Sequence, residues 1–261
     1  MHYFGEQNNR SNRMKIGIIG IGNIGGTLAR KLAAAGHEVR VANSKGAEAV
    51  RPFAEEIGAT AADTRAAVSG ADLVIMSIPP PAIAKLPRDL FQDVPAGVPV
   101  VDTANYYPGM RDPQIAELDA GEVESVWVSR QLGRPVIKAF NNILARSLTQ
   151  LGQPEGTPGR LAVAVAGDDA AAKQLVMGIV NEVGFDPVDG GPLTESWRQQ
   201  PSTPGYWCDY DAATMRKALA AAVKGEAPAK RDQLLEKMGA LGPNATHADI
   251  VAMNRSLNPL A

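Results

Sequence analysis

The sequence is short of cysteine and of aromatic residues. Its single cysteine, Cys208, cannot form an internal disulfide, so the fold does not depend on an oxidising compartment and we expect a cytoplasmic protein. Aromatic residues make up only 5% of the 261 positions, which suits a layered interior rich in small aliphatic residues. The 45% hydrophobic and 21% charged content is ordinary for a globular enzyme.

The sequence also lacks a strong charge imbalance and long apolar runs. A formal net charge of -2 gives no electrostatic attraction for a polyanion, so we predict no nucleic-acid partner. The best apolar run, 73–78, ends at three prolines and falls short of the ~20 residues that span a bilayer, so no membrane partner is predicted. Residues 1–13 are polar and lack a signal-peptide core. We expect a disordered extension or tag there, before a natural start at Met14.

From residue 14 to about residue 143, short apolar runs alternate with segments of helical period. This pattern predicts an α/β protein with a Rossmann-type, doubly wound parallel sheet. The predicted strands are 15–19, 38–42, 73–77, 98–102 and 135–140. Several are apolar at consecutive positions, as expected of strands buried on both faces. After the first strand, Ile24, Leu28 and Leu32 recur at helical spacing and Gly36 ends the helix.

A Gly- and Pro-rich stretch at 151–159 is the best candidate for a domain boundary. It would separate an NADP-binding domain, 14–150, from a smaller C-terminal substrate or dimerisation region, 151–261. Strands at 161–166 and 185–189, with a helix between them, predict a further βαβ unit that can extend the first sheet. Helical stripes and a capping box are predicted beyond it, at Met215, Leu219 and Val223, at Leu234, Met238 and Leu241, and at Thr246 with Asp249.

The motif Gly20-Ile21-Gly22-Asn23-Ile24-Gly25 follows an apolar strand and opens an amphipathic helix, the context in which GxGxxG binds a dinucleotide. Gly20 permits the tight turn, Gly22 lets the backbone approach the pyrophosphate, and Gly25 lets the helix pack on the sheet. The helix N-terminus, at Asn23 and Ile24, presents N–H groups to the phosphates. The alternative is that these glycines merely turn a strand into a helix.

The end of the second predicted strand indicates which dinucleotide is bound. An acidic residue there would bind the ribose 2′-OH and repel a 2′-phosphate, but the sequence reads Asn43-Ser44-Lys45. Ser44 can donate a hydrogen bond and Lys45 a full charge to a phosphate. We therefore predict NADP(H) at Asn43, Ser44 and Lys45. The alternative is a solvated turn that leads into the next helix.

Residues that directly follow the later strands are expected to wall the nicotinamide, because parallel sheets bind ligands beyond the carboxyl ends of their strands. The candidates are the segments 77–81, 103–108 and 141–142, and from them we assign Ser77, Ile78, Pro79, Ala104 and Asn141 to the cofactor site. The alternatives are a rigid loop for the prolines and a helix cap for Asn141.

Four segments resemble the NADPH:deazaflavin (coenzyme F420) oxidoreductases and the related oxidoreductase domains of six-transmembrane metalloreductases. The segments are 18–25, 42–45, 136–141, and 165–170 leading to 184–193. The resemblance implies NADP(H) on the Rossmann unit, with a flavin or 8-hydroxy-5-deazaflavin ring as second substrate against the nicotinamide. It places Ser44 and Lys45 near the 2′-phosphate, and Ser77, Ile78, Pro79 and Ala139 along the cofactor.

We predict no catalytic side chain and no metal site. Hydride transfer between two rings chiefly needs proximity and orientation, and the cofactors supply the chemistry. The three histidines, His2, His37 and His247, lie in no recognisable acid/base motif, and His37 is expected to be structural.

The chain beyond Leu193 departs from the compact members of the family and favours a homodimer. It carries Trp197, Arg198, Tyr206, Trp207, Cys208 and Tyr210. The aromatic residues can form a ring-binding wall, a dimer interface or ordinary core. Arg198 can meet an anionic substrate tail or form a surface salt bridge.

The sequence therefore predicts an NADP-dependent oxidoreductase that transfers a hydride between NADPH and a flavin or deazaflavin acceptor, a small-molecule substrate. One alternative is a reductase of a small imine or carbonyl in the 6-phosphogluconate-dehydrogenase-like group, with Tyr106, Lys138 or Asn141 polarising the acceptor. The other is a non-catalytic NADP(H)-binding redox sensor that signals through its C-terminal helices.

Overall fold

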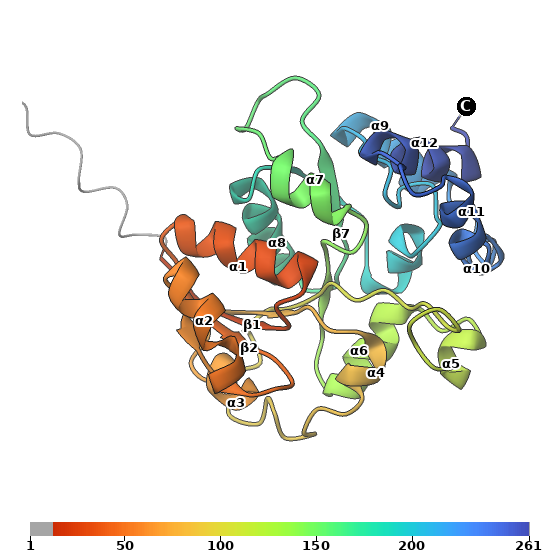
Figure 1. Cartoon of the computed structure of the whole chain (residues 1–261). Helices are drawn as coiled ribbons and strands as arrows, with labels where there is room; N and C mark the ends of the chain where they lie inside the picture. The colour runs from red at the N-terminus through yellow and green to blue at the C-terminus, as the bar shows by residue number, and fades with distance from the viewer. Residues whose placement is uncertain (1–12, 261) are drawn as a thin grey trace, which may run out of the picture.

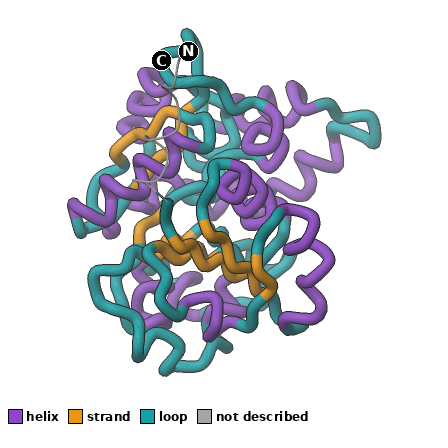
Figure 2. Tube along the Cα trace, turned by 90° about the vertical axis from the view of Figure 1, so that its left-hand side faces the viewer, coloured by secondary structure: helices purple, strands orange, loops and turns teal. Residues whose placement is uncertain are grey.

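A parallel six-stranded sheet forms the centre of the computed structural model, which describes residues 13–260 (Figures 1 and 2). Its strand order is β3-β2-β1-β4-β5-β6, so the predicted Rossmann-type fold class is confirmed. The strands are β1 Lys15–Ile19, β2 Glu38–Ala42, β3 Thr60–Ala61, β4 Leu73–Met76, β5 Val100–Asp102 and β6 Ile137–Lys138. All but one residue of the predicted N-terminal extension, 1–13, lies outside the described residues.

Alternate residues of the central strands face two separate helical layers, because successive side chains of a strand point to opposite faces. Ile18 packs in one apolar cluster and Ile19 in another. Helices of the first layer are α1 Asn23–Ala34, α2 Ala47–Ile57, α7 Ala145–Gln150 and α8 Ala170–Glu182. Those of the second are α3 Thr64–Val68, α4 Pro80–Ile83, α5 Ala116–Asp119 and α6 Glu124–Leu132. Burial on both faces explains the consecutive apolar residues of these strands.

The predicted second βαβ unit is present, but it forms a two-stranded sheet of its own that only an isolated bridge joins to the first sheet, so it does not extend that sheet as predicted. β7 Ala162–Val165 pairs in parallel with β8 Asp186–Asp189. Lys138 N donates to Ala166 O at 2.8 Å and Ala166 N donates to Lys138 O at 3.0 Å, which forms an antiparallel bridge from β6 to the second unit. Val163 and Phe185 pack in the same cluster as Leu28 of α1, so one apolar core spans both sides of the predicted boundary at 151–159.

The C-terminal part is helical and gathers at one end of the molecule (Figure 1). It comprises the 3-10 helix η1 Leu193–Gln199 and the helices α9 Ala212–Ala221, α10 Ala227–Asp232, α11 Leu234–Ala240 and α12 His247–Leu257. The predicted capping box of Thr246 and Asp249 is confirmed at the start of α12. The prediction that Val223 extends the α9 stripe is wrong, because Ala222 leaves the helix in extended backbone and Val223 is 57% exposed.

Several predicted strands are shorter in the structure than in the sequence pattern, and for two of them the backbone shows why. The strand expected at 135–140 spans only β6, because Phe140 has a φ of 61° and turns the chain out of the sheet. The strand expected at 98–102 begins at Val100, after Pro99. The short strand β3 was not predicted, since two residues carry no periodic signal.

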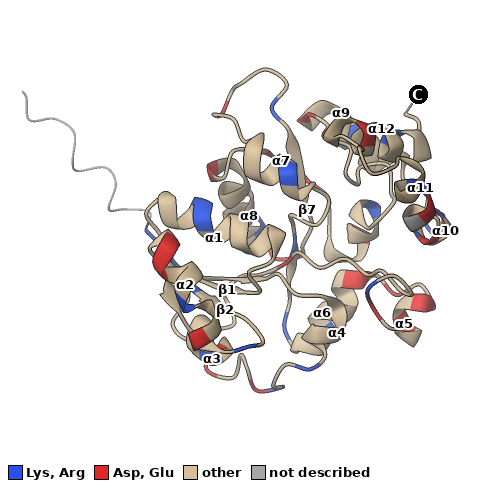
Figure 3. Cartoon of the chain, viewed as in Figure 1, with Lys and Arg blue, Asp and Glu red and all other residues tan. Residues whose placement is uncertain are grey.

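Charges of both signs are interspersed over the helices and loops (Figure 3). Many of them pair locally, as Arg30 of α1 does with Glu56 of α2 at 2.8 Å. None of the helices between residues 13 and 260 combines the length and the apolar character that crossing a bilayer requires.

Candidate active site

Gly20 and Gly25 are required by the fold itself. Gly20 has a φ of 99°, and a Cβ there would lie 2.2 Å from Ser77 O. A Cβ on Gly25 would lie 2.0 Å from Gly20 O, far inside van der Waals contact. These two glycines let β1 turn sharply into α1 and let α1 lie close to the end of β4.

Gly22 differs from its neighbours, because a Cβ there would meet no protein atom within 4 Å. Its φ of -69° and ψ of -164° are also open to other residues. Gly22 is the N-cap of α1 and supplies no side chain to cap the helix N–H groups. The free space and the positive end of the helix fit a dinucleotide pyrophosphate, which the backbone N–H groups at Gly22, Asn23 and Ile24 could hold.

The turn after β2 presents its side chains to solvent. Asn43 Oδ1 accepts a hydrogen bond from Lys45 N at 2.8 Å, which fixes the turn, and Ser44 and Lys45 are exposed. The acidic residue of the first turn of α2, Glu48, pairs with Arg51. This carboxylate therefore has its charge compensated, and the hydroxyl of Ser44 and the ammonium of Lys45 suit a 2′-phosphate.

A groove of about 390 Å³ lies at the carboxyl edge of the sheet. It brings together seven of the predicted residues: Gly22, Asn23, Ile24, Ser77, Ile78, Pro79 and Asn141. Ala104 and Ala139 do not line it, because their side chains are turned into the core behind it, with 6% and 0% exposure. The turn at Asn43, Ser44 and Lys45 lies outside it as well, as expected for the distal end of an extended dinucleotide.

The prolines and Asn141 can be assigned from their contacts. Pro79 is the N-cap of α4 and Pro80 begins that helix, so the prolines start a short helix where a rigid loop was the alternative. Asn141 is not a helix cap, because the N-cap of α7 is Leu144.

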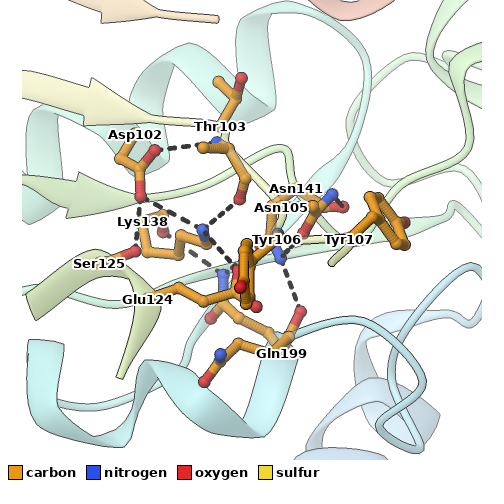
Figure 4. A network of polar contacts seen from close by, with 12 residues as sticks. Asp102, Thr103, Asn105, Tyr106, Tyr107, Glu124, Ser125, Lys138, Asn141 and Gln199 are labelled. Atoms are coloured by element: carbon orange, nitrogen blue, oxygen red, sulfur yellow. Dashed lines mark hydrogen bonds and ion pairs between the residues drawn. The ribbon is translucent and has the colours of Figure 1, made fainter. Parts of the chain in front are cut away.

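Asn141 belongs to a network of amide side chains beside the groove (Figure 4). Its Nδ2 donates to Asn105 Oδ1 at 3.0 Å and to Gln199 O at 2.7 Å. Gln199 Nε2 donates to Asn141 Oδ1 at 3.0 Å, and Asn105 Nδ2 donates to Asn141 O at 2.9 Å. Both hydrogens of the Asn141 amide are thus engaged within the protein.

Lys138 lies behind the groove in a buried polar cluster (Figure 4). Its Nζ is 3.2 Å from Asp102 Oδ2 and 3.9 Å from Glu124 Oε2, and it donates to Ala104 O. Ser125 Oγ donates to Asp102 Oδ2 at 2.6 Å. Burial raises the pKa of Glu124, and the charge of Lys138 opposes that shift.

Tyr106 also points away from the groove. Its hydroxyl donates to Asp119 Oδ1 at 2.8 Å and accepts from Ile115 N at 2.8 Å. Burial raises the pKa of Tyr106 to about 12. Of the three residues considered as acceptor-polarising groups, only Asn141 reaches the groove.

Comparison with known proteins places this geometry in a family. Residues 15–106 match the family described as NADP oxidoreductase, coenzyme F420-dependent, and this segment contains the glycine motif and the turn after β2. Protein YjhV of Escherichia coli strain K12 is 56% identical over 125 residues, which are 48% of this chain and 84% of YjhV. The chain belongs to the coenzyme F420-dependent NADP oxidoreductase family. It is an NAD(P)-dependent oxidoreductase.

Two solved structures resemble this oxidoreductase over most of its length. The hypothetical protein SMa0349 from Sinorhizobium meliloti is 30% identical with a TM-score of 0.60, covering 73% of this chain and 91% of that one. A protein from Arthrobacter sp. FB24, proposed to be an F420-dependent NADP reductase, is 26% identical with a TM-score of 0.54. That match covers 70% of this chain and 87% of the Arthrobacter protein.

The groove of the oxidoreductase also includes Thr103, Asn105 and Tyr107 from the segment after the strand at 98–102, and Trp207, one of the tail aromatics considered for a ring-binding wall. The sequence did not single out Arg111, Ile143 and Ala145, which line the groove as well. Thr103 Oγ1 donates to Ser77 Oγ at 3.1 Å, which links the ends of β4 and β5. Thr103, Asn105 and Tyr107 were predicted because they closely follow a strand, whereas no local pattern marks Arg111, Ile143 or Ala145.

The predicted functional residues of the tail fall into different environments. Tyr206 is fully buried, and its hydroxyl is hydrogen bonded to that of Tyr107. Arg198 forms a salt bridge, one of its two predicted alternatives, at 2.8 Å to Glu195. Its guanidinium lies 4.5 Å from the ring centre of Trp197.

His37 is buried and structural, as expected. Its Nδ1 accepts from Met14 N at 3.1 Å, and its Nε2 lies 2.9 Å from Glu182 Oε2. The ring therefore fastens the start of β1 to the end of α8, on the side of the molecule away from the groove lining.

Proposed function

We propose that this oxidoreductase transfers a hydride between NADPH and a flavin or deazaflavin ring. The observation that carries the proposal is the groove that joins Gly22 and the N-terminus of α1 to Asn141, past the ends of β4 and β5. A dinucleotide held at Gly22 would direct its nicotinamide along this groove. A ring lying beside it there would be in position to exchange a hydride.

NADPH is favoured over NADH by the turn after β2. Exposed Ser44 and Lys45 offer a hydroxyl and a positive charge to a 2′-phosphate, and Glu48 is already paired with Arg51. A charge-assisted contact of this kind strengthens phosphate binding and has no counterpart in NADH.

The protein's own part in the reaction is to bind and orient. The N–H groups of α1 would hold the pyrophosphate, and the Thr103–Ser77 hydrogen bond fixes the floor of the groove. The amides of Asn105 and Asn141 hold each other and form a rigid polar wall. When bound, NADPH supplies the hydride, and the acceptor takes up that hydride together with a proton from solvent.

The alternative of a small imine or carbonyl reductase has less support. That chemistry benefits from a side chain that donates a proton to the acceptor. Lys138 is held by Asp102, Tyr106 contacts Asp119, and both hydrogens of Asn141 Nδ2 are engaged within the protein. The three side chains considered for that role are therefore committed to contacts inside the fold.

A screen of acceptors tests the proposal. NADPH absorbance is followed under anaerobic conditions with 8-hydroxy-5-deazaflavin, FMN, FAD, a cyclic imine and a small aldehyde. We expect oxidation of NADPH with at least one of the flavin-type rings and not with the last two. Turnover with only the imine or aldehyde would support the alternative reductase. Tight NADPH binding with no turnover at all would support a redox sensor.

A further inference from the structure

Trp207 has an unusual backbone. Its φ of 56° lies in the left-handed region, and among residues 13–260 only three other non-glycine residues share a positive φ. A bulky residue rarely adopts this conformation, so a conformation of this kind persists only where its surroundings impose it. Trp207 N donates to Asn142 O at 2.9 Å, which ties the residue to the start of the segment leading into α7.

The indole of Trp207 rests on a buried aromatic support. It stacks on Tyr206 with ring centres 4.8 Å apart and planes inclined by 20°. Tyr206 is wholly buried, and its hydroxyl is fixed by the hydroxyl of Tyr107 and by Asn105 Nδ2 at 3.2 Å. The indole therefore has a preset position, which lowers the entropy cost of placing a ligand against it.

Trp207 borders the same groove as the glycine motif. The indole is only half-buried, and Gly22, Ile24 and Ser77 line the other parts of the groove. Gly22, Ile24 and Ser77 belong to the Rossmann unit, whereas Trp207 comes from the C-terminal region. The groove thus has a dinucleotide end and an aromatic end, which different parts of the chain supply.

We infer that Trp207 is the binding residue against which the planar ring of the hydride acceptor is held. The ligand class is a fused heteroaromatic ring of the isoalloxazine or deazaisoalloxazine type. An indole offers a large flat face at low conformational cost, and stacking of this kind favours a flat ring over a small aliphatic imine or aldehyde. The inference rests on the proposed function and adds to it the residue that selects the acceptor.

The strain at Trp207 supports a role in binding. A glycine or asparagine would adopt this φ more readily than a tryptophan. Tyr107, Tyr206 and Leu234 form a buried apolar cluster beside Trp207. Trp207 packs against the edge of this cluster and is only partly buried, so packing alone does not account for a tryptophan in this disfavoured conformation. Trp207 also lines the groove, where a bound ligand can contact the indole.

The test compares Trp207→Leu and Trp207→Phe with the control Trp197→Phe, whose tryptophan packs on Arg198 and does not line the groove. We expect Trp207→Leu to raise KM for FMN or 8-hydroxy-5-deazaflavin by about tenfold, with a smaller change in kcat. Trp207→Phe keeps a ring and is expected within about threefold of wild type. The dissociation constant for NADPH should stay unchanged in all three variants.

A second measurement uses the wild-type protein, in case Trp207→Leu does not fold. Hydroxyl-radical footprinting with mass spectrometry follows the oxidation of individual tryptophans in the NADP+ complex. Addition of FMN or 8-hydroxy-5-deazaflavin should protect Trp207 and leave Trp197 unchanged.

The possible results separate the two proposals. If flavin-type rings are reduced but KM is unchanged in Trp207→Leu and Trp207 is not protected, the inference about Trp207 is overturned and the proposed function stands. If no flavin-type ring is bound or reduced by the wild-type protein, both are overturned.

Discussion

Lys138 Nζ lies 3.2 Å from Asp102 Oδ2, and both side chains are wholly buried. The pair joins the last residue of β5 to the last residue of β6, directly behind the groove. Ser125 Oγ and Ala104 N also donate to the Asp102 carboxylate, so hydrogen bonds within the protein stabilise its buried charge. Such a pair fixes the geometry of the strand ends, and removal of one member leaves an uncompensated charge in the interior.

Lys138→Met is expected to lower the free energy of unfolding by about 3–5 kcal/mol, because Asp102 remains buried without its partner. Chemical denaturation would measure this loss. The double variant Lys138→Met/Asp102→Asn should lose less than the sum of the two single variants, since the residues are coupled. Arg30→Met, which breaks a half-exposed pair with Glu56, is the control and should show a much smaller loss. Equal losses of unfolding free energy in Lys138→Met and Arg30→Met would contradict the stabilising role of the buried Lys138–Asp102 pair.

The stability of Glu124→Gln should depend on pH relative to wild type. Burial raises the folded-state pKa of Glu124 above its ordinary value of 4.5, so the carboxyl group favours its protonated form in the folded protein. In the wild type, Glu124 makes its full contribution to the free energy of unfolding below pH 4.5. This contribution is lost as the pH rises through the folded-state pKa. Glutamine does not ionise, so the free energy of unfolding of the variant should rise relative to that of wild type as the pH increases.

Urea denaturation over the acidic to neutral range would follow this difference. Glu48→Gln is the control of opposite sign, because the hydrogen bond and charge of Arg51 lower the pKa of the exposed Glu48. A constant difference between Glu124→Gln and wild type at all pH values would show that Glu124 is ionised alike in both states.

Gly22→Ala should separate binding from folding. A Cβ at Gly22 meets no protein atom within 4 Å, so the melting temperature should be close to that of wild type. The methyl group would occupy space needed by the pyrophosphate, and we expect loss of NADPH and NADH binding in calorimetric titration. Gly25→Ala is the comparison, since its Cβ would lie 2.0 Å from Gly20 O and should impair folding. If Gly22→Ala retained its affinity for NADPH and NADH, this loop would not be the site that binds the pyrophosphate.

Lys45→Ala should weaken NADPH binding by about 1–3 kcal/mol, because one charge-assisted contact to the 2′-phosphate is lost. The affinity for NADH should change little. Lys224→Ala, an exposed lysine in the C-terminal helical part, is the matched control and should affect neither dinucleotide. Equal losses for NADPH and NADH would refute the role of Lys45 in cofactor choice.

Cys208 should be inert in the folded protein. It is 1% exposed, and burial raises the pKa of its thiol to about 12. Because the thiolate is the reactive form, a disulfide reagent such as DTNB should react very slowly without denaturant and release a single equivalent in urea. A fast reaction under native conditions would indicate that the segment around Tyr206 opens readily.

The sequence predicted most of the strand and helix order, because strands buried on both faces are visible in the sequence as runs of apolar residues. It missed β3 and overextended the strand at 135–140, where the backbone of Phe140 turns by tertiary constraint. Within the site, the glycine motif and the residues Ser77 to Pro79 were found because they directly follow strands.

The sequence named Trp207 as a possible ring-binding residue but could not place it at the groove. Trp207 reaches it through a hydrogen bond to Asn142, 65 positions earlier in the chain, and through stacking on a buried tyrosine. Ala104 and Ala139 occupy the correct strand ends, but the turn of the backbone there directs their methyl groups into the core. Which way a side chain points at a strand end depends on backbone twist that the residue type does not encode.

The bridge between Lys138 and Ala166 limits where the polypeptide chain can be divided. Val163 and Phe185 share a core with α1, so a fragment that stops at residue 150 would leave that core open to water. The exposed loop 154–159 carries no strand or helix and protrudes from the molecule (Figure 1). It is thus a place to insert a peptide tag, and not a place to divide the protein into two independently folding halves.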